Sequence, residues 1–453
     1  MLDFIRNAGA FVVAIGILVA FHEFGHFWVA RKLGVKVLRY SVGFGKPLWL
    51  RRGRDGCEYV IAAIPLGGYV KMLDEREGEV PAGEAHLAFN RQSPYKRLAI
   101  VAAGPIANFL LAIVFFWMMY VIGQPGLKPV VAEPMAQSVA AKAGVREGEV
   151  VTRVNGEAVE TWNSLRTMLL ETVVNREPLQ LTLQASVKDD STRTLAVPLD
   201  AVRIEPEFLF DDLGLSPYLM KIEPVLVGVE PGGAADQVGF KPGDKLLSRD
   251  GVEIKDWQAW ALWVRANAGA MPVVSFERAG QVMSLQPLLA TIEEDGKRMG
   301  RFGAYINPPG EAPPELRAED HLSPFAAVPA AIDQTWRTSV LTLKMLGKMV
   351  TGEVSLKNVS GAISIAQAAG YTASIGIATF LSFLALVSVS LGVLNLLPVP
   401  LLDGGHLVYY TIEIIKGSPL SDQVMVAGQK VGLTFLMLLM GLAFYNDLSR
   451  LIG

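Results

Sequence analysis

Four apolar runs stand out along the chain, and each is long enough, or nearly long enough, to cross a lipid bilayer. They occupy residues 11–30, 98–122, 373–402 and 431–446. A helix needs about 20 apolar residues to span a hydrocarbon core about 30 Å thick. The last run is shorter, and the stem of Lys430 can extend it toward the headgroups. The pattern therefore predicts a polytopic α-helical membrane protein with four transmembrane helices.

The segment 58–70 has a different pattern. It is rich in β-branched and aromatic residues and is interrupted by proline and glycine, which is typical of a β-hairpin rather than a helix. Two placements remain open for this hairpin. It can dip into the membrane, or it can lie at the level of the headgroups.

An internal repeat lies between the second and third apolar runs. Four positions recur with a constant offset of 95 residues: Gly144, Gly148, Gly156 and Trp162 return as Gly239, Gly243, Gly251 and Trp257. The text around them predicts a helix end, a turn, a strand and a tight turn in each copy. The insert therefore holds two small α+β domains that resemble tandem PDZ domains. Such domains can bind a peptide as an extra strand, and a pair of them can also act as a size gate.

Residues 324–372 combine helical periodicity with basic side chains. This composition favours amphipathic helices that lie on the outer membrane face and connect the repeats to the third span.

Charge adds an orientation to this picture. The connector 31–97 holds 13 Lys or Arg against 7 Asp or Glu, whereas each short terminal flank holds one Arg. Cationic loops stay in the cytosol, so the connector is expected there, with both termini and the repeats outside. A net charge of −3 gives no reason to expect a nucleic-acid partner. The single cysteine, Cys57, excludes an intrachain disulfide.

The expected domain organisation follows from these patterns. It comprises a first transmembrane helix (1–30), a cytosolic loop with the membrane-associated β-hairpin (31–97), a second transmembrane helix (98–122), two PDZ-like domains (123–220 and 221–310), amphipathic connecting helices (311–372), a third transmembrane helix (373–403), and a loop with the fourth (404–453).

The first span carries the candidate chemistry. His22 and His26 are four residues apart, so they share one helix face and can bind one metal ion, while Glu23 turns toward a water on that ion as general base. A signal peptide is the alternative, but no small-residue cleavage site follows the run. The pattern His22-Glu23-Phe24-Gly25-His26 thus indicates a zinc hydrolase site.

Asp403 is expected to complete the ligand set. Together with Glu23 it is one of two acids within or bordering the first three apolar spans, and a carboxylate there is costly without a partner such as a metal. Two His and one carboxylate leave the fourth zinc position open for water, as in catalytic sites. The alternative is an ordinary residue at a helix end. His406 lies close enough in sequence to remain a lesser candidate ligand.

The third span is interrupted by Pro398 and Pro400, whose freed backbone carbonyls are tolerated in a membrane where they line a cavity. Asn395 can hold an extended substrate backbone or make an interhelical hydrogen bond. In the second span, the small residues at 104–108 favour close helix packing over a catalytic role.

These motifs amount to a resemblance to the site-2 protease family of intramembrane zinc metalloproteases. The resemblance is carried by residues 22–26 and 395–404, and the segments 40–46 and 64–72 and the order of spans agree with it. Resemblance to its bacterial members implies an inner-membrane enzyme whose substrate is the transmembrane helix of a single-span protein. The implied substrates are an anti-sigma factor already trimmed by a first protease, in envelope stress signalling, and remnant signal peptides.

The residues also suggest how such a substrate is held and cut. His22, His26 and Asp403 would hold one Zn²⁺ while Glu23 moves protons. An unwound substrate can pair with a sheet edge, for which Gly67, Gly68 and Tyr69 are the candidates.

Two rival functions remain. One is a non-catalytic membrane-anchored PDZ scaffold with a structural metal, and the other is a zinc transporter. A structural site needs no general base, and a transporter would carry several acids along its path, so Glu23 favours the protease.

Overall fold

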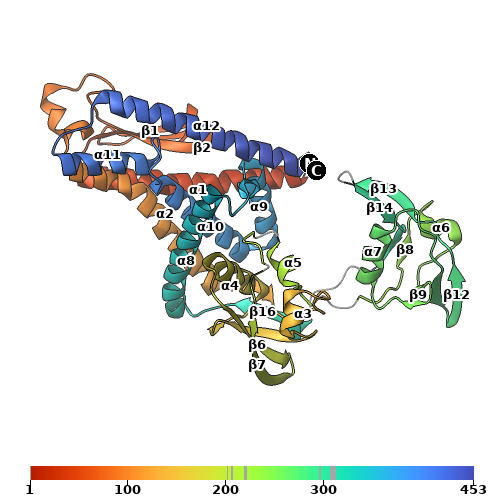
Figure 1. Cartoon of the computed structure of the whole chain (residues 1–453). Helices are drawn as coiled ribbons and strands as arrows, with labels where there is room; N and C mark the ends of the chain where they lie inside the picture. Colours follow the sequence, from red (N-terminus) through yellow and green to blue (C-terminus); the bar gives the residue numbers. More distant parts are fainter. Residues whose placement is uncertain are drawn as a thin grey trace.

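The computed structural model describes residues 2–200, 202–205, 208–218, 222–294, 297–306 and 313–452. Within these residues four helices are long and apolar enough to span a membrane, which confirms the expected class (Figure 1). They are α1 (Leu2–Lys32), α2 (Pro94–Ile122), α10 (Ile377–Leu396) and α12 (Asp422–Ile452).

The third apolar run contains two helix breaks. Gly376, with φ of 151°, separates α9 (Ala362–Ile375) from α10. The helix α10 then stops at Leu396, because the following Leu397 precedes Pro398 and is extended, as residues before proline prefer. Helix α11 (Asp403–Lys416) begins directly after this turn. The continuous span expected over 373–402 is therefore shorter, and Asp403 starts a new helix.

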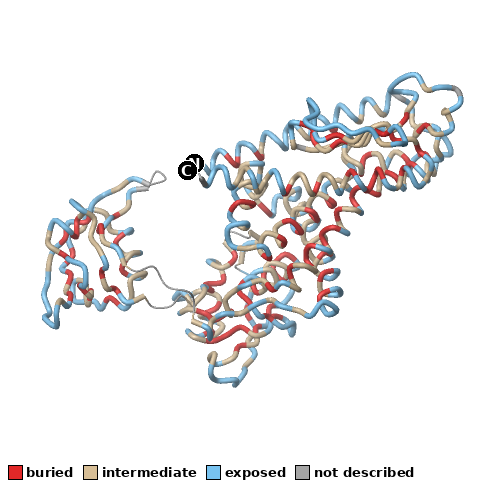
Figure 2. Tube along the Cα trace, turned by 180° about the vertical axis from the view of Figure 1, so that it is seen from behind, coloured by how far each residue is buried: buried red, intermediate tan, exposed pale blue. Residues whose placement is uncertain are grey.

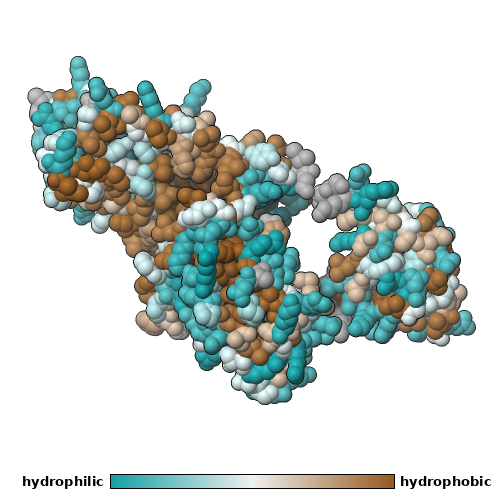
Figure 3. Space-filling view, in the orientation of Figure 1, coloured by the Kyte–Doolittle hydropathy of each residue, from teal (hydrophilic) through white to brown (hydrophobic). Residues whose placement is uncertain are grey.

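Helix α2 is the centre of the membrane bundle and packs against α1, α8 (Pro324–Thr351), α10 and α11. The shared core contains Leu18 of α1, Phe116 of α2 and Leu384 of α10, all 2% exposed or less. Apolar side chains also gather on the outer surface of this helical part, whereas the domains between the spans expose more hydrophilic surface (Figure 3). The distribution is that of a protein whose helices face lipid.

The segment 58–70, predicted to form a hairpin, lies within the single strand β2 (Glu58–Met72), which pairs with β1 (Val37–Arg52). The hairpin is therefore formed by β1 and β2 and not within 58–70. Arg39 pairs with both Lys71 and Glu58, so the first half of β1 has a partner on each side. The second half of β1 pairs with 58–62 alone. The sheet therefore contains four segments in the order 47–52, 58–62, 37–44 and 64–72. Within the described residues, no strand covers the outer side of the segment 64–72, which is an edge.

The repeat forms two matching domains. The first has the sheet order β5-β4-β6-β7 and the second β10-β9-β11-β12. Gly144 and Gly239 end equivalent short helices in the left-handed conformation, with φ of 90° and 93°, which favours glycine. The elements of the first domain are α3 (Val139–Ala143), β4 (Val150–Val154), β5 (Glu157–Ala158), α4 (Trp162–Asn175), β6 (Leu179–Ser186), β7 (Asp189–Val197) and α5 (Leu209–Leu213). Those of the second are β8 (Gly228–Val229), α6 (Ala234–Val238), β9 (Lys245–Arg249), β10 (Val252–Glu253), α7 (Trp257–Ala266), β11 (Val274–Arg278), β12 (Gln281–Leu285), β13 (Ala290–Glu294), β14 (Lys297–Arg301) and β15 (Ala304–Tyr305).

Each domain buries its own core, visible as separate buried clusters in Figure 2. The chain enters the pair through β3 (Gln124–Leu127) and leaves it through β16 (Arg317–Asp320), and these two strands pair with each other. Short 3₁₀ turns complete the fold at Ala82–Leu87, Phe89–Arg91, Pro314–Leu316 and Leu356–Asn358.

Candidate metal centre

Three ligand atoms from two helices converge at one point. The Nε2 atoms of His22 and His26 on α1 are 3.2 Å apart. The Oδ2 atom of Asp403, at the start of α11, lies 3.2 Å from the first and 3.4 Å from the second. Ligands about 2.0–2.2 Å from a tetrahedral zinc ion are separated by roughly 3.3–3.5 Å. The triangle therefore has the size that a single zinc ion requires.

The burial of these atoms also fits a cation. Asp403 Oδ2 is buried and has no hydrogen-bond partner among the described residues. Its nearest neighbours are two imidazole nitrogens, and a carboxylate in such a place is costly unless a positive charge compensates it. Two nitrogens and one oxygen form the open ligand set of a catalytic zinc site. The three residues thus fit the metal that the sequence predicts.

Hydrogen bonds set the orientation of both imidazoles. His26 Nδ1 lies 2.9 Å from the carbonyl of Ile100, which only accepts, so Nδ1 carries the proton and Nε2 keeps a free lone pair. His22 Nδ1 lies 3.2 Å from Asn108 Nδ2, and Asn108 Oδ1 is buried without a partner among the described residues. Exchanging the two amide atoms turns Oδ1 toward His22 Nδ1, so that Oδ1 accepts from Nδ1–H and Nε2 keeps a free lone pair. Both Nε2 atoms are then available to a metal.

Helix α2 approaches the two histidines closely because of two glycines. A Cβ at Gly104 would collide with the imidazoles of His26 and His22, and one at Gly25 would collide with the Ala103 backbone. The small residues at 104–108 therefore pack closely, as the sequence predicts, but they pack against the ligands. The contact of Asn108 with His22 was not predicted. This contact could have been predicted from the four-residue spacing of Gly104 and Asn108, which places both residues on one helix face.

Glu23 is 9% exposed and faces the sheet. A Cβ at Gly68 would lie 2.9 Å from Glu23 Cγ and 2.8 Å from Val19 Cγ1, so only glycine lets β2 cross α1 here. The Tyr40 hydroxyl donates to the Ala20 carbonyl at 2.6 Å and fixes the sheet to the same helix. The edge segment thus passes directly beside the predicted general base.

The residues Gly67, Gly68 and Tyr69 all lie on this edge segment. Gly67 has φ of 137° and packs against the ring of Phe44, which in turn stacks on Tyr69 at 6.1 Å. The three residues predicted to bind substrate therefore lie on the sheet edge that passes beside Glu23. Their role in substrate binding stays a prediction.

The turn that presents Asp403 is tightly packed. Pro400 lies against Gly432 of α12, and a Cβ at Gly404 or Gly405 would collide with the backbone of the turn. Leu401 adopts φ of 88°, a conformation that costs a non-glycine residue energy and is common at functional sites. Asn395 is half-buried in the last turn of α10, and Pro398 is exposed. His406 stands outside the three-ligand cluster, against Tyr409 and Tyr410.

Comparison with known proteins agrees with this geometry. The model of peptidase family M50 matches residues 10–439. The chain is 44% identical over 454 residues to the regulator of sigma-E protease RseP of Escherichia coli, covering all of both chains. It is 43% identical over 453 residues to protease RseP of Yersinia pestis and 42% identical over 451 residues to the Salmonella typhimurium protein, again over full length. The chain therefore belongs to peptidase family M50 and is a membrane zinc metalloprotease of the RseP type.

Proposed function

We propose that this protein hydrolyses a peptide bond within the transmembrane segment of single-span membrane proteins. The observation that carries the proposal is the position of Glu23 between the ligand triangle and an open sheet edge. A base, a metal site and a surface that binds extended peptide are the three parts that such hydrolysis needs.

His22, His26 and Asp403 would hold one Zn²⁺ per chain. When bound, the ion lowers the pKa of water and polarises a carbonyl group. Glu23 takes the proton from the attacking water and gives it to the leaving amine. Asn108 and the Ile100 carbonyl hold the imidazoles so that their lone pairs stay directed at the site.

A substrate helix hides its peptide bonds in its own hydrogen bonds, so it must unwind before it is cut. The edge segment 64–72 offers replacement partners along its free side. Asn395, Pro398 and Pro400 precede Asp403 in the chain and would contribute a second binding surface, where Asn395 would bind the extended backbone. Gly67, Gly68 and Tyr69 would bind it from the sheet.

Charge and relatedness supply the topology and substrates of this proposal. The cationic 31–97 loop would lie in the cytosol of a bacterium, and the repeat domains and both termini in the periplasm. Similarity to the regulator of sigma-E protease supports an anti-sigma factor as substrate after a first cut, in envelope stress signalling. Remnant signal peptides are a second substrate class. The repeat domains would exclude proteins that still carry a bulky outer domain.

The test compares the wild type with Glu23→Gln in a host membrane, measuring bound metal beside cleavage of a tagged single-span substrate that lacks its outer domain. Glutamine keeps the shape and removes the base. We expect about one zinc in both proteins and cleavage reduced at least 10²-fold in the variant. Equal cleavage by the two proteins would exclude the assigned mechanism. Bound zinc with no cleavage by either would favour a PDZ scaffold with a structural metal.

A further inference from the structure

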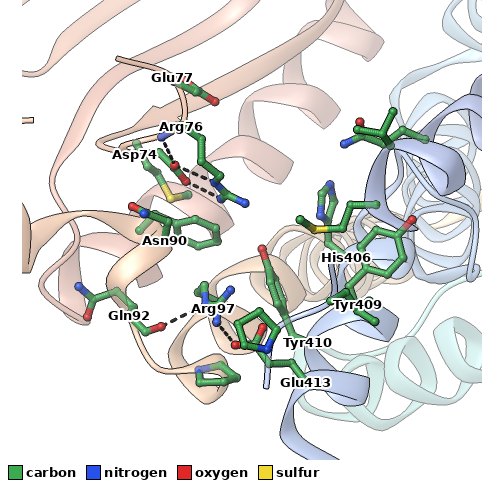
Figure 4. A pocket seen from close by; sticks show the side chains of 18 of the residues that line it. Asp74, Arg76, Glu77, Asn90, Gln92, Arg97, His406, Tyr409, Tyr410 and Glu413 are labelled. Carbon is green, nitrogen blue, oxygen red and sulfur yellow. Dashed lines mark hydrogen bonds and ion pairs between the residues drawn. The ribbon is translucent and has the colours of Figure 1, made fainter. Parts of the chain in front are cut away.

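A cavity of about 920 Å³ opens between the sheet and helices α11 and α12. Figure 4 shows its two walls, with Asp74, Arg76 and Asn90 on one side and His406 and Tyr409 on the other. This volume is at the upper end of the roughly 300–1,000 Å³ typical of ligand pockets. The cavity is therefore large enough for several residues of a peptide.

Both walls of the cavity start at the metal centre. The edge segment passes Glu23 at Gly68 and reaches the cavity at Val70 and Met72, and a strand covers the four steps from position 68 to position 72 in about 13 Å. Helix α11 starts with Asp403 and reaches the cavity one turn later at His406. A peptide that pairs with the edge beside Glu23 and continues along it therefore enters this space.

The lining suits an extended peptide better than an anion. The cationic groups Arg76 and Arg97 are paired, with Asp74 at 2.6 Å and with Glu413 at 2.6 Å, so they leave no net positive site. The Tyr409 hydroxyl is buried without a hydrogen-bond partner among the described residues. A Cβ at Gly428 of α12 would collide with this oxygen, so the hydroxyl is enclosed against that helix.

Apolar groups complete the lining, since Phe89, Tyr410, Met425 and Val426 face the same space. Apolar walls with a few convergent polar groups are typical of a binding site.

We infer that this cavity is the subsite for the part of the substrate that leaves the metal centre toward the 31–97 loop, which is the cytosolic side in the proposed topology. The inference rests on the proposed function and deepens it. The ligand is an extended peptide segment several residues from the scissile bond, bound along 68–72 on one side and α11 on the other.

The test uses cysteine crosslinking in the full-length chain. Glu23→Gln keeps the substrate uncut, and Cys57→Ala removes the native thiol. Val426→Cys then lies in the cavity lining, while Val424→Cys, two residues earlier and outside the lining, is the matched control, since the two valines are 48% and 51% exposed. The probe is a single-span substrate with one cysteine, four residues to either the cytosolic or the outer side of the bond that the wild type cuts.

We expect Val426→Cys to form a disulfide with the cytosolic-side cysteine about tenfold more than with the outer-side one, because disulfides need Cβ atoms about 3.5–4.5 Å apart. The control should show no such preference. Equal yields for the two positions, or for the two variants, would overturn the inference.

A second measurement fills the cavity without crosslinking. Val426→Trp in the active enzyme should reduce cleavage about tenfold or more because the substrate chain no longer fits, while Val424→Trp should cut at the wild-type rate. If both variants cut at the wild-type rate, the subsite is wrong while the proteolytic function stands. A wild type that cuts no substrate would instead refute the proposed function.

Discussion

The two repeat domains share one internal support. In the first, Arg193 pairs with the buried Glu149 and also donates to the carbonyl of the cap residue Gly144. In the second, Arg278 does the same with Asp244 and Gly239. The carboxylates lie 95 residues apart, like the glycines of the repeat. Arg193 reaches its carboxylate from β7 and Arg278 from the end of β11, so the two arginines come from non-equivalent strands.

The domains differ in how they meet the membrane part. Arg337 of α8 bonds Glu157 of the first domain at 2.8 Å and approaches Glu171 at 3.6 Å. The Thr161 hydroxyl, at the start of α4, donates to Asp320 of β16 at 3.0 Å. Within the described residues, no hydrogen bond or ion pair joins 222–306 to the membrane part, and Figure 1 shows this domain set apart.

The two repeat domains are alike in the contacts that stabilise each fold and differ in the contacts that attach each domain to the membrane part. Each domain has its own buried core, an arginine–carboxylate pair and the same sheet order, so the repeat determines the fold. Only the first domain carries acids at positions that meet Arg337, so contacts outside the repeat determine where a domain sits. The first domain is therefore anchored to α8 and β16, whereas the described residues of the second domain make no such hydrogen bond or ion pair.

The largest effect is expected from Asp244→Ala. This change leaves Arg278 without its partner beside a fully buried position, and breaking a buried pair costs about 3–5 kcal/mol. Limited proteolysis should then cut within 222–306, and the fluorescence of Trp257, Trp260 and Trp263 should change. Bound metal should be unchanged, because no hydrogen bond or ion pair joins the described residues of the second domain to the membrane part. Loss of metal would show that the two regions are coupled.

A smaller effect is expected from Arg337→Ala, which removes the ion pairs between α8 and the first domain. Because this arginine is one-third exposed, we expect the contact to weaken by about 1–2 kcal/mol. A double-mutant cycle with Glu157→Gln, read by thermal unfolding of the full chain, measures the coupling. Arg301→Ala is the control, since its partner Glu230 lies within the second domain. Equal coupling in both pairs would contradict the comparison.

The smallest effect concerns pH. Burial raises the pKa of Glu171, although Arg337 opposes it, and burial raises the pKa of Asp320 against a hydrogen bond from Thr161. A carboxyl whose pKa is raised in the docked state holds its proton more tightly there. Its contribution to docking is present at low pH and lost as the pH rises through the raised pKa.

We therefore expect the first domain to become more resistant to proteolysis as the pH falls from about 7 to about 5. Glu171→Gln should reduce this dependence. A dependence that is unchanged in this variant would assign the effect to other groups.

Much of the architecture could be predicted from local sequence. The spans follow from apolar length, and the repeat follows from glycines that need unusual backbone angles. His22 and His26 were identifiable because one helix turn brings them together. Asp403 was identifiable because a carboxylate beside an apolar span needs a partner.

The remaining features depend on which distant surfaces meet. Arg97 and Glu413 form a buried pair 316 residues apart, and Asn108 reaches His22 across two helices. The residues 373–402 look like one apolar run because a single glycine, Gly376, hardly changes the mean hydropathy of the segment. The same glycine nevertheless separates two helices. The order of the segments in the sheet could not be predicted from the sequence either. The first half of β1 pairs on both sides, and no local sequence pattern indicates a second partner strand.

The distance in sequence between the ligands has a consequence for the synthesis of the protein. Asp403 is made 377 positions after His26 (26 to 403), which takes roughly 20 to 75 s at about 5–20 residues per second. During that interval the two histidines are already in the nascent chain, while both repeat domains are still to be made. A ribosome that stalls between His26 and Asp403 leaves a fragment with two candidate ligands and no third. The growing chain thus lacks a complete candidate metal site until both repeat domains have been made.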